Sequence, residues 1–424
     1  MTPPRLSVYT LCMRAWRVVL LVLVACGDCA AEETTPDWLG SADEPAQHAT
    51  PEGLFSEGLA GANNRFALAL YEQLAERPGN LVFSPASIAS ALSMTYAGAR
   101  GETASEMADA LHFAGLQAHE VHSSYRRQLA VWNEDHGGAY ELRVVNRMFV
   151  EGSLALNEEY SALTRDSYGA APQPLDFRHD PEGARLHIND WVKDNTGQAI
   201  RDLLPPRALS PQSQLVIANA VYFRGLWRSP FQESDTELRP FFAPEGERNV
   251  ATMVGDTSCY PSVDGVEVVR LPYVSDFEML ILMPVARDGL AALERRLTPE
   301  MLSSWLDRRG PPRPVRLFLP KFSDDTSLRL GDALRRLGLG RALGSGADFS
   351  GMSSQPLEFP EVAHRALIEV NEEGTVATAA TATYGVMGPQ SEPRDLHVDH
   401  PFIFIIRDTR TGAWLFVGRI VDPR

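Results

Sequence analysis

The chain has 424 residues, of which 44% are hydrophobic and 22% are charged. This balance is typical of a soluble globular protein with one large domain or two ordinary ones. The formal net charge is −16, and only Lys193 and Lys321 are lysines. An acidic body repels polyanions, and short arginine pairs such as Arg126-Arg127 are typical of solvated helix faces. We therefore expect no nucleic-acid partner.

The N-terminus reads as an export signal. Arginines precede an apolar run at 18–25, which is too short to span a bilayer as a helix but fits a secretory signal. The run ends in Leu23-Val24-Ala25-Cys26, which resembles the bacterial lipobox, so we expect a lipoprotein-type signal peptide at 1–25 and lipid on Cys26. The alternative is an ordinary secretory signal cleaved after Cys29-Ala30. Either places the protein outside the cytoplasm, lipid-anchored to a bacterial membrane or secreted.

Residues 26–58 have the composition of a tether. They are rich in Pro, Glu, Asp, Ala and Thr, which favours disorder, so we expect the folded domain at 59–424. Cys259 is the only cysteine within that domain. The chain therefore lacks a disulfide framework and the spacing of a metal site, and we expect no cofactor.

Hydrophobic spacing and turn residues predict the elements in chain order. The predicted helices are 64–74 with Asn64 as N-cap, one opened by Pro85, one through Met107 and Leu111, 157–168, 187–200 and 328–337. The predicted strands are a short one ending at Ser84, 142–150, 215–227, 266–272, 277–283, 315–322, 364–371, 402–407 and 413–420, the last two forming a hairpin. Helices gather early and strands late, which indicates one mixed α+β domain.

A stretch of small residues near the C-terminus is central to the interpretation of the whole chain. After an acidic turn ending at Gly374, the chain runs through small Ala and Thr residues with no Pro before Pro389. At the two-residue period of a strand, one face carries Thr375, Ala377, Ala379, Thr381 and Thr383, and the other Val376, Thr378, Ala380, Ala382 and Tyr384. Composition alone also fits a flexible linker. As a strand, the small-residue face would slot into an existing sheet without overfilling it.

Several motifs together resemble the serpin family. They are Ser84-Pro85, Gly98-Ala99, Gly101-Glu102-Thr103, Asn219-Ala220-Val221-Tyr222-Phe223, Leu319-Pro320-Lys321-Phe322, Asp399-His400-Pro401-Phe402 and Phe416-Val417-Gly418-Arg419. The resemblance runs from about Asn63 to the C-terminus. It implies the serpin fold, in which helices pack on a large central mixed sheet with smaller sheets beside it and a reactive-centre loop is exposed.

The resemblance also implies a function. Serpins inhibit serine endopeptidases, and some cysteine ones, as suicide substrates: the protease forms an acyl-enzyme with the loop, and the cut loop enters the sheet as a new strand. Such a protein has no catalytic residue of its own and is expected to be monomeric. The implied hinge of the loop is Glu372, Glu373, Gly374, Thr375, Val376, Ala377, Thr378, Ala379 and Ala380. Val376 and Thr378 depart from the family pattern, but both lie on the outward face.

Other site residues follow from the same resemblance. Ser84, Ser87, Asn219 and His364 match the shutter, a buried polar network beneath the sheet, and Trp227 matches a packing residue where the loop enters, the breach. Counting forward from Glu372 places the scissile bond at Met387-Gly388 or Gly388-Pro389, whereas counting back from Pro401 points to Gln390-Ser391. Pro after the cut resists most proteases, so we favour Met387-Gly388. An apolar residue there suits chymotrypsin-, elastase-, subtilisin- or papain-like enzymes.

Two other functions, an enzyme and a non-inhibitory serpin, are alternatives to inhibition. The sequence carries no nucleophile elbow, P-loop or His-Glu-x-x-His zinc motif, and His119 and His122 have the wrong spacing for zinc, so an enzyme is not expected. The second rival is a non-inhibitory serpin that acts as a binding protein or chaperone. Incubation with proteases distinguishes it, because only an inhibitor leaves a covalent complex.

Overall fold

The structure is a computed structural model that describes residues 58–134, 140–307, 313–357, 363–375 and 393–424. The expected signal peptide, the tether up to residue 57 and most of the reactive loop therefore lie outside the described residues. The helices are α1 (Leu59–Leu74), α2 (Pro85–Gly98), α3 (Gly101–Ala110), α4 (Ala118–Trp132), α5 (Glu158–Tyr168), α6 (Pro181–Asn195), α7 (Leu290–Glu294), α8 (Pro299–Asp307) and α9 (Gly331–Arg336), with a 3-10 turn at Glu233–Asp235. Within the described ranges, none of the helices has the length and apolarity needed to cross a membrane.

The strands of the described residues form two sheets. The nine-stranded sheet has the order β1 (Leu81–Phe83), β15 (Trp414–Ile420), β14 (Phe402–Asp408), β8 (Phe277–Pro284), β7 (Val266–Pro272), β6 (Gly246–Val263), β9 (Arg313–Pro320) and β13 (Arg394–His397), with β5 (Glu237–Ala243) paired to β6. The six-stranded sheet has the order β10 (Phe322–Arg329), β11 (Ala363–Val370), β12 (Gly374–Thr375), β4 (Leu215–Leu226), β2 (Tyr140–Glu151) and β3 (Pro172–Leu175).

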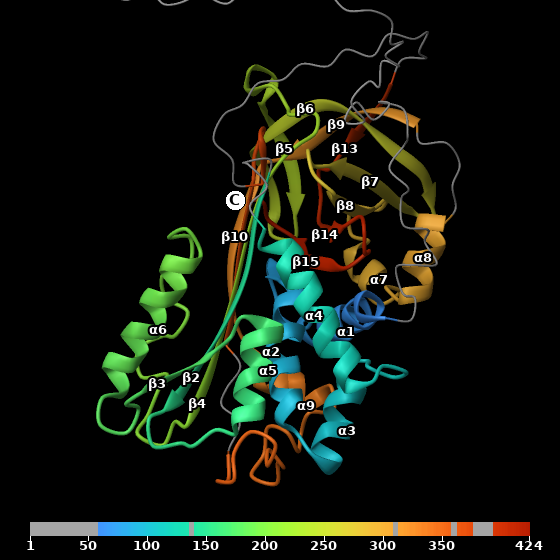
Figure 1. Cartoon of the computed structure of the whole chain (residues 1–424). Coiled ribbons are helices and arrows are strands. Elements are labelled where there is room, and N and C mark those ends of the chain that lie inside the picture. Colours follow the sequence, from blue (N-terminus) through green and yellow to red (C-terminus); the bar gives the residue numbers. More distant parts are fainter. Residues whose placement is uncertain (1–57, 135–139, 308–312, 358–362, 376–392) are drawn as a thin grey trace, which may run out of the picture. The chain divides into compact units, whose positions relative to one another are not determined.

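The six-stranded sheet has a helical layer on each side (Figure 1). Helices α2, α4 and α5 lie on what we call its inner face, where the strands contribute the large hydrophobic core. Helix α6 lies alone on the outer face, where Ile188 and Val192 join a smaller cluster with Val216, Ala218 and Ala220 of β4. Because alternate residues of a strand point to opposite faces, the odd and even residues of β4 belong to these two cores.

Local sequence explains where several elements begin and end. Ser84 caps α2, since its hydroxyl accepts a hydrogen bond from the Ser87 amide at 3.2 Å, and Pro85 occupies the first turn, where its missing N–H costs nothing. Gly169 ends α5 in the left-handed conformation that favours glycine. The predicted strand at 81–84, the helix opened by Pro85 and the C-terminal hairpin are all confirmed.

The helix predicted at 187–200 instead spans Pro181–Asn195, since Asp180 caps it by accepting a hydrogen bond from the Gly183 amide. Two other element predictions were wrong because of distant contacts. Asn64 does not cap α1, which begins at Leu59; its buried amide instead donates to the Gly412 carbonyl at 2.9 Å and accepts from the Trp414 amide at 3.0 Å. The helix predicted at 328–337 is shorter, because Leu328 belongs to β10 and pairs with His364. In both cases, a contact with a distant segment overrides the local signal.

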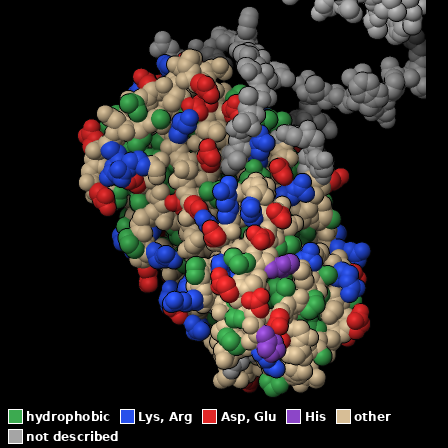
Figure 2. Space-filling model, turned by 90° about the vertical axis from the view of Figure 1, so that its left-hand side faces the viewer, with side chains coloured by type: hydrophobic (Ala, Val, Ile, Leu, Met, Phe, Trp, Pro, Cys, Tyr) green, Lys and Arg blue, Asp and Glu red, His purple; other side chains and the backbone are tan. Residues whose placement is uncertain are grey.

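The face that carries α6 shows no single-signed patch. Figure 2 shows lysine and arginine side chains intermingled with aspartate and glutamate side chains across it. Charges of both signs are therefore interspersed on this face, as on an ordinary solvated surface.

Candidate functional site

The hinge turns the chain back between two strands. After β11 the chain reverses at Asn371, whose side-chain oxygen accepts hydrogen bonds from the amides of Glu373 and Gly374 at 3.1 and 3.2 Å. Strand β12 then pairs antiparallel with β11 on one side (Val370 with Thr375) and with β4 on the other (Thr375 with Gly225). The hinge residues Gly374 and Thr375 thus already form the first rungs of a strand between β11 and β4.

Gly374 is required by a close approach of two backbones. A Cβ atom at this position would lie 2.0 Å from the Gly225 carbonyl oxygen, far inside contact distance. Because only glycine lacks that atom, any substitution would push β12 away from β4. The end of the acidic turn is therefore fixed by sterics as well as by hydrogen bonds.

An aromatic pair holds the hinge from beside it. Trp227 donates its backbone amide to the Glu373 carbonyl at 2.8 Å and its indole N–H to the Asn371 carbonyl at 3.0 Å. Its ring stacks on Tyr273 with the centroids 4.5 Å apart, and the Tyr273 hydroxyl lies 2.7 Å from the Thr375 hydroxyl. Both aromatic rings and Thr375 are buried. Trp227, predicted at the breach, thus contacts the hinge directly.

Glu372 anchors the hinge to the neighbouring loop and strand. Its backbone carbonyl accepts from the Phe231 amide at 2.9 Å, and its carboxylate accepts from the Thr236 hydroxyl at 2.7 Å and the Lys321 ammonium at 2.8 Å. Burial alone would raise the pKa of Glu372, but the hydrogen bonds from Lys321 and Thr236 outweigh it and lower that pKa below its usual value. The carboxylate is therefore ionised and paired at neutral pH.

The four predicted shutter residues come together beneath the middle of the six-stranded sheet. Ser87 donates its hydroxyl to the Asn219 side-chain oxygen, and the Ser84 amide donates to Nε2 of His364 at 3.1 Å. The Asn219 amide group in turn donates to the side-chain oxygen of Asn146 at 2.6 Å. The beginning of α2 is thus linked to β2, β4 and β11, which lie on both sides of β12.

His364 is neutral and has one unused donor. Burial lowers its pKa to about 3, so the imidazole is uncharged at neutral pH. Since Nε2 accepts from Ser84, the proton lies on Nδ1, and this buried nitrogen has no hydrogen-bond partner among the described residues. Asn146, which joins the network, likewise has a buried side-chain nitrogen without a partner among the described residues. Because burying a polar group without a partner costs free energy, the shutter is not fully satisfied.

Four residues that contact this site were not identified from sequence. They are Asn146, Thr236, Tyr273 and Lys321. Asn146 had a signal, because period two places it on the buried face of the strand predicted at 142–150. The only sequence signals for Lys321 were the rarity of lysine in this chain and its place in one of the family-like motifs. Thr236 and Tyr273 had no sequence signal, since their hinge partners Glu372 and Thr375 lie over 100 residues away.

The far end of the loop rejoins the nine-stranded sheet. Strand β13 pairs in parallel with β9, and Arg394 binds Glu267 through two hydrogen bonds of 3.0 and 3.1 Å. The His397 ring stacks on Phe318 with the centroids 4.3 Å apart, and the Arg239 guanidinium lies 4.2 Å from the centre of the same Phe ring. The two ends of the loop are therefore tied to different sheets.

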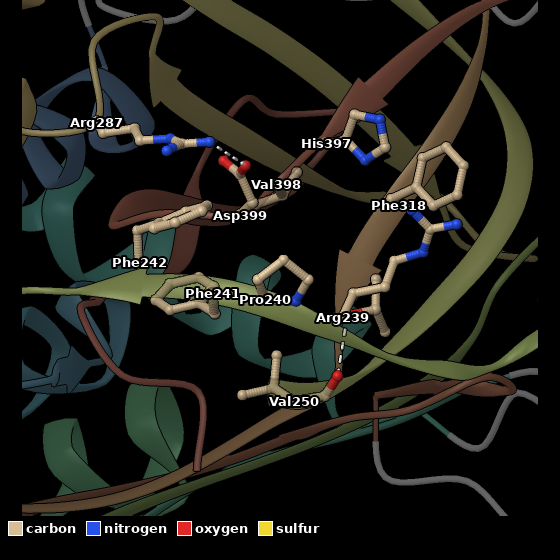
Figure 3. Close-up of a pocket in the computed structure, with 11 residues that line it drawn as sticks. Arg239, Pro240, Phe241, Phe242, Val250, Arg287, Phe318, His397, Val398 and Asp399 are labelled. Atoms are coloured by element: carbon tan, nitrogen blue, oxygen red, sulfur yellow. Dashed lines mark hydrogen bonds and ion pairs between the residues drawn. The ribbon is translucent and has the colours of Figure 1, made fainter. Parts of the chain in front are cut away.

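Beside this anchor, β5 and the segment after β13 enclose a cavity of about 230 Å³ (Figure 3). Arg287 lies over the Phe242 ring at 3.5 Å and pairs with Asp399 at 3.5 Å. Both of the cavity's guanidinium groups are thus already engaged, Arg239 by Glu237 and Phe318 and Arg287 by Asp399 and Phe242. The arrangement strengthens the attachment of the segment 397–399 to β5.

The remaining predicted site residues lie outside the described residues. They are Val376, Ala377, Thr378, Ala379 and Ala380 of the hinge, the bonds Met387-Gly388 and Gln390-Ser391, and the lipid-accepting Cys26. Their roles stay predictions.

Comparison with known proteins agrees with this geometry. The family model described as "Serpin (serine protease inhibitor)" matches residues 61–423. Iripin-3 of Ixodes ricinus is 39% identical over 373 residues, which cover 85% of this chain and 94% of that protein. The leukocyte elastase inhibitor of Bos taurus is 38% identical over 389 residues, 87% of this chain and all of that protein.

Solved structures show the same architecture. The crystal structure of Serpin48 from the insect Tenebrio molitor superposes with a TM-score of 0.76 at 27% identity, over 87% of this chain and 99% of that one. This likeness confirms the predicted α+β fold. With a family model that covers nearly the whole described body and relatives well above 30% identity, the chain belongs to the serpin family.

Proposed function

We propose that this chain inhibits serine endopeptidases, and cysteine endopeptidases of the papain type, as a suicide substrate. The protease nucleophile attacks the carbonyl carbon of the residue before the scissile bond, the C–N bond breaks, and the new amine leaves with a proton. An acyl-enzyme remains. The freed loop then enters the six-stranded sheet before water can hydrolyse the ester or, with a cysteine protease, the thioester. Membership of the serpin family and relatives named as protease inhibitors support this proposal.

The observation that carries the proposal is the double pairing of Thr375. It faces Gly225 on β4 and Val370 on β11. A strand that continued beyond Thr375 would therefore pair with both neighbours in a fixed register. Six residues further along, position 381 would lie opposite position 219 of β4 and position 364 of β11. Thr381 would therefore arrive between Asn219 and His364, the two shutter residues that lie on these strands.

The inner face of such a strand would suit its surroundings. Thr375, Ala377, Ala379, Thr381 and Thr383 would share the face on which the odd residues of β4 and the even residues of β11 are buried. Small side chains add a strand there without overpacking the core. The Thr381 hydroxyl could also accept a hydrogen bond from Nδ1 of His364, which supplies the partner that this nitrogen lacks among the described residues.

The energy of insertion is large compared with the stability of a domain. Residues 376–385 could pair with β4 as far as Leu215, and residues 376–382 with β11 as far as Ala363, forming roughly seventeen ladder hydrogen bonds in all. At about 0.5 kcal/mol each, the low end for a net hydrogen bond, these contribute on the order of 10 kcal/mol. This equals the usual stability of a whole domain. Insertion can therefore drive the trapping of a protease.

A direct test is incubation of the purified protein with subtilisin, chymotrypsin and papain. We expect a complex that survives denaturant, because the acyl bond is covalent, and cleavage within the loop. Cleavage of the loop without any complex would instead support the non-inhibitory rival, a serpin that binds or chaperones other molecules. The nicked protein should also unfold at a higher temperature than the intact one.

We assign the scissile bond to Met387-Gly388, with Gln390-Ser391 as the alternative. In the register above, residue 385 reaches Leu215 at the end of β4, so Met387 would arrive just past the sheet and Gln390 five residues beyond it. An apolar residue before the cut suits chymotrypsin-, elastase-, subtilisin- or papain-like proteases. Mass spectrometry of the small fragment released on complex formation identifies the bond, since its first residue is either Gly388 or Ser391.

We further propose that the protein is a monomer held at a bacterial membrane, outside the cytoplasm, by lipid on Cys26. The support is the order of positive residues, apolar run and lipobox-like Leu23-Val24-Ala25-Cys26. Labelled palmitate should be incorporated into the wild type but not into Cys26→Ser, and only the wild type should sediment with membranes. A soluble wild-type product cleaved after Ala30 would instead show ordinary secretion. Light scattering tests the monomer.

A further inference from the structure

A cavity of about 610 Å³ lies at the end of the six-stranded sheet opposite the hinge. Its lining includes Val216 of β4, His364 of β11 and Leu328 of β10, together with Leu203, Leu204 and Leu209 from the segment after α6. All of these side chains except Leu209 are buried. Polar and charged residues such as Asp202, Gln212 and Arg329 share the lining with these apolar side chains. The cavity is therefore a hollow of mixed character at the place where β4 and β11 begin.

The outer face of β4 changes character along its length. Ala218 and Ala220 lie beneath α6, packed in the same cluster as Ile188 and Val192, so little room remains there for a large neighbour. Val216 belongs to the same face but borders the cavity. Moving away from the hinge, the outer face is thus tight at 220 and 218 and hollow at 216.

The outward-facing residues of the loop change in size to match this change in space, with two small residues followed by a large one. In the register set by Thr375 and Gly225, Ala380 would face Ala220, Ala382 would face Ala218 and Tyr384 would face Val216. Directly opposite residues on paired strands point to the same side. The two small residues would therefore pass beneath α6, and the first large one would arrive at the hollow.

We propose that this cavity is the seat of the Tyr384 side chain once the cut loop has entered the sheet. The proposal rests on the proposed function, because Tyr384 reaches the cavity only by insertion. The aromatic ring would bury its apolar surface against Leu203, Leu204 and Leu209. This contact would stabilise the last residues of the inserted strand. Tyr384 thereby acts as a positioning residue that fastens the far end of the new strand.

The test compares the intact and loop-cleaved forms of four variants in guanidinium. Tyr384→Ala should lower the unfolding midpoint of the cleaved form by about 0.3 M, as expected for a lost buried aromatic contact, and leave that of the intact form unchanged. Tyr384→Phe should behave as the wild type. Val285→Ala is the control, because Val285 is exposed and lies outside both the loop and the cavity.

The fourth variant, Leu209→Trp, fills the cavity from the opposite wall. It should destabilise the cleaved form when Tyr384 is present and much less when position 384 is Ala, so the two substitutions should be non-additive. Tyr384→Ala should also raise the number of inhibitor molecules consumed for each protease trapped.

Two failures can be told apart. If the cleaved wild type is no more stable than the intact one, the loop does not insert and the proposed function fails. If the cleaved wild type is stabilised but Tyr384→Ala matches it, or the effects of Leu209→Trp and Tyr384→Ala simply add, insertion stands and the seat is wrong.

Discussion

The two sheets of this molecule are built for opposite purposes. The nine-stranded sheet runs through β14 and β15, whose residues are almost all buried and apolar and which pair along their whole length. The six-stranded sheet instead covers a polar network of Ser, Asn and His side chains. Hydrogen bonds can exchange partners, whereas close apolar packing separates only at a large cost. The difference teaches that a sheet can stay ready to open where polar groups lie beneath it.

The largest effect is expected from a charge on the entering strand. Thr375 is buried against Tyr273, and Thr375→Arg would place an unpaired cation there. Burying such a charge costs several kcal/mol, so we expect the yield of trapped protease to fall by about 100-fold or more, with the variant cleaved as a substrate. Gel analysis of protease mixtures measures this. Thr375→Ser keeps the hydroxyl and should still trap, and a trapping Arg variant would contradict the insertion route.

The pH dependence should come from the histidines buried on the six-stranded side. The pKa of His364 is lowered by burial to about 3, so below pH 6.5 the unfolded state binds a proton that the folded state does not. Stability therefore falls as pH falls, by about 1.4 kcal/mol from His364 between pH 7.5 and 5.5. His122, whose pKa burial lowers to about 4, adds a similar loss. In urea unfolding, His364→Gln should remove about half of the combined change, and an unaltered pH slope would exclude this role.

Reversal of the hinge ion pair should have a smaller effect. Glu372→Lys places two cations at the contact now made between Glu372 and Lys321 at 2.8 Å. Because the lysine is partly exposed and solvent screens it, we expect a loss of about 1–2 kcal/mol in the unfolding free energy of the intact protein. Lys321→Glu in the same molecule should restore part of it. A double variant no better than Glu372→Lys would mean that Thr236 carries the anchor.

The smallest effect is expected in the nine-stranded sheet. Ile405 of β14 is fully buried, and Ile405→Val should cost about 1 kcal/mol through lost packing. Since the nine-stranded sheet takes up no strand, the loss should be the same in the intact and the cleaved protein, and trapping of protease should be unchanged. A loss confined to one of the two forms would show that this sheet also rearranges.

Local chemistry made much of the fold predictable. The Ser84-Pro85 pair, the turn at 408–412 and the apolar run along 215–227 each indicate an element that the structure contains. What could not be predicted depends on distant partners. Asn64 resembles a helix cap, but its amide binds residues of the C-terminal hairpin, and no local pattern announces that contact.

The residues of the candidate site were likewise only partly predictable from the sequence. Family-like motifs pointed to Trp227 and to the four shutter residues, which the structure places at the hinge and beneath the sheet. The ion pair of Lys321 and the hydroxyl contact of Tyr273 depend on how β9 and the end of β7 approach the hinge. Such approaches follow from packing of the whole chain rather than from any short stretch of it.

The attachment of the loop's two ends to different sheets makes the reaction a single event. After cleavage, the part before the cut would travel with β12 down the six-stranded sheet, while the part after it stays with β13. Ten further rungs at about 3.4 Å each would carry the inserted part roughly 35 Å along the sheet from β12. The severed bond cannot be rejoined across that distance, so each molecule serves once and must be replaced by synthesis.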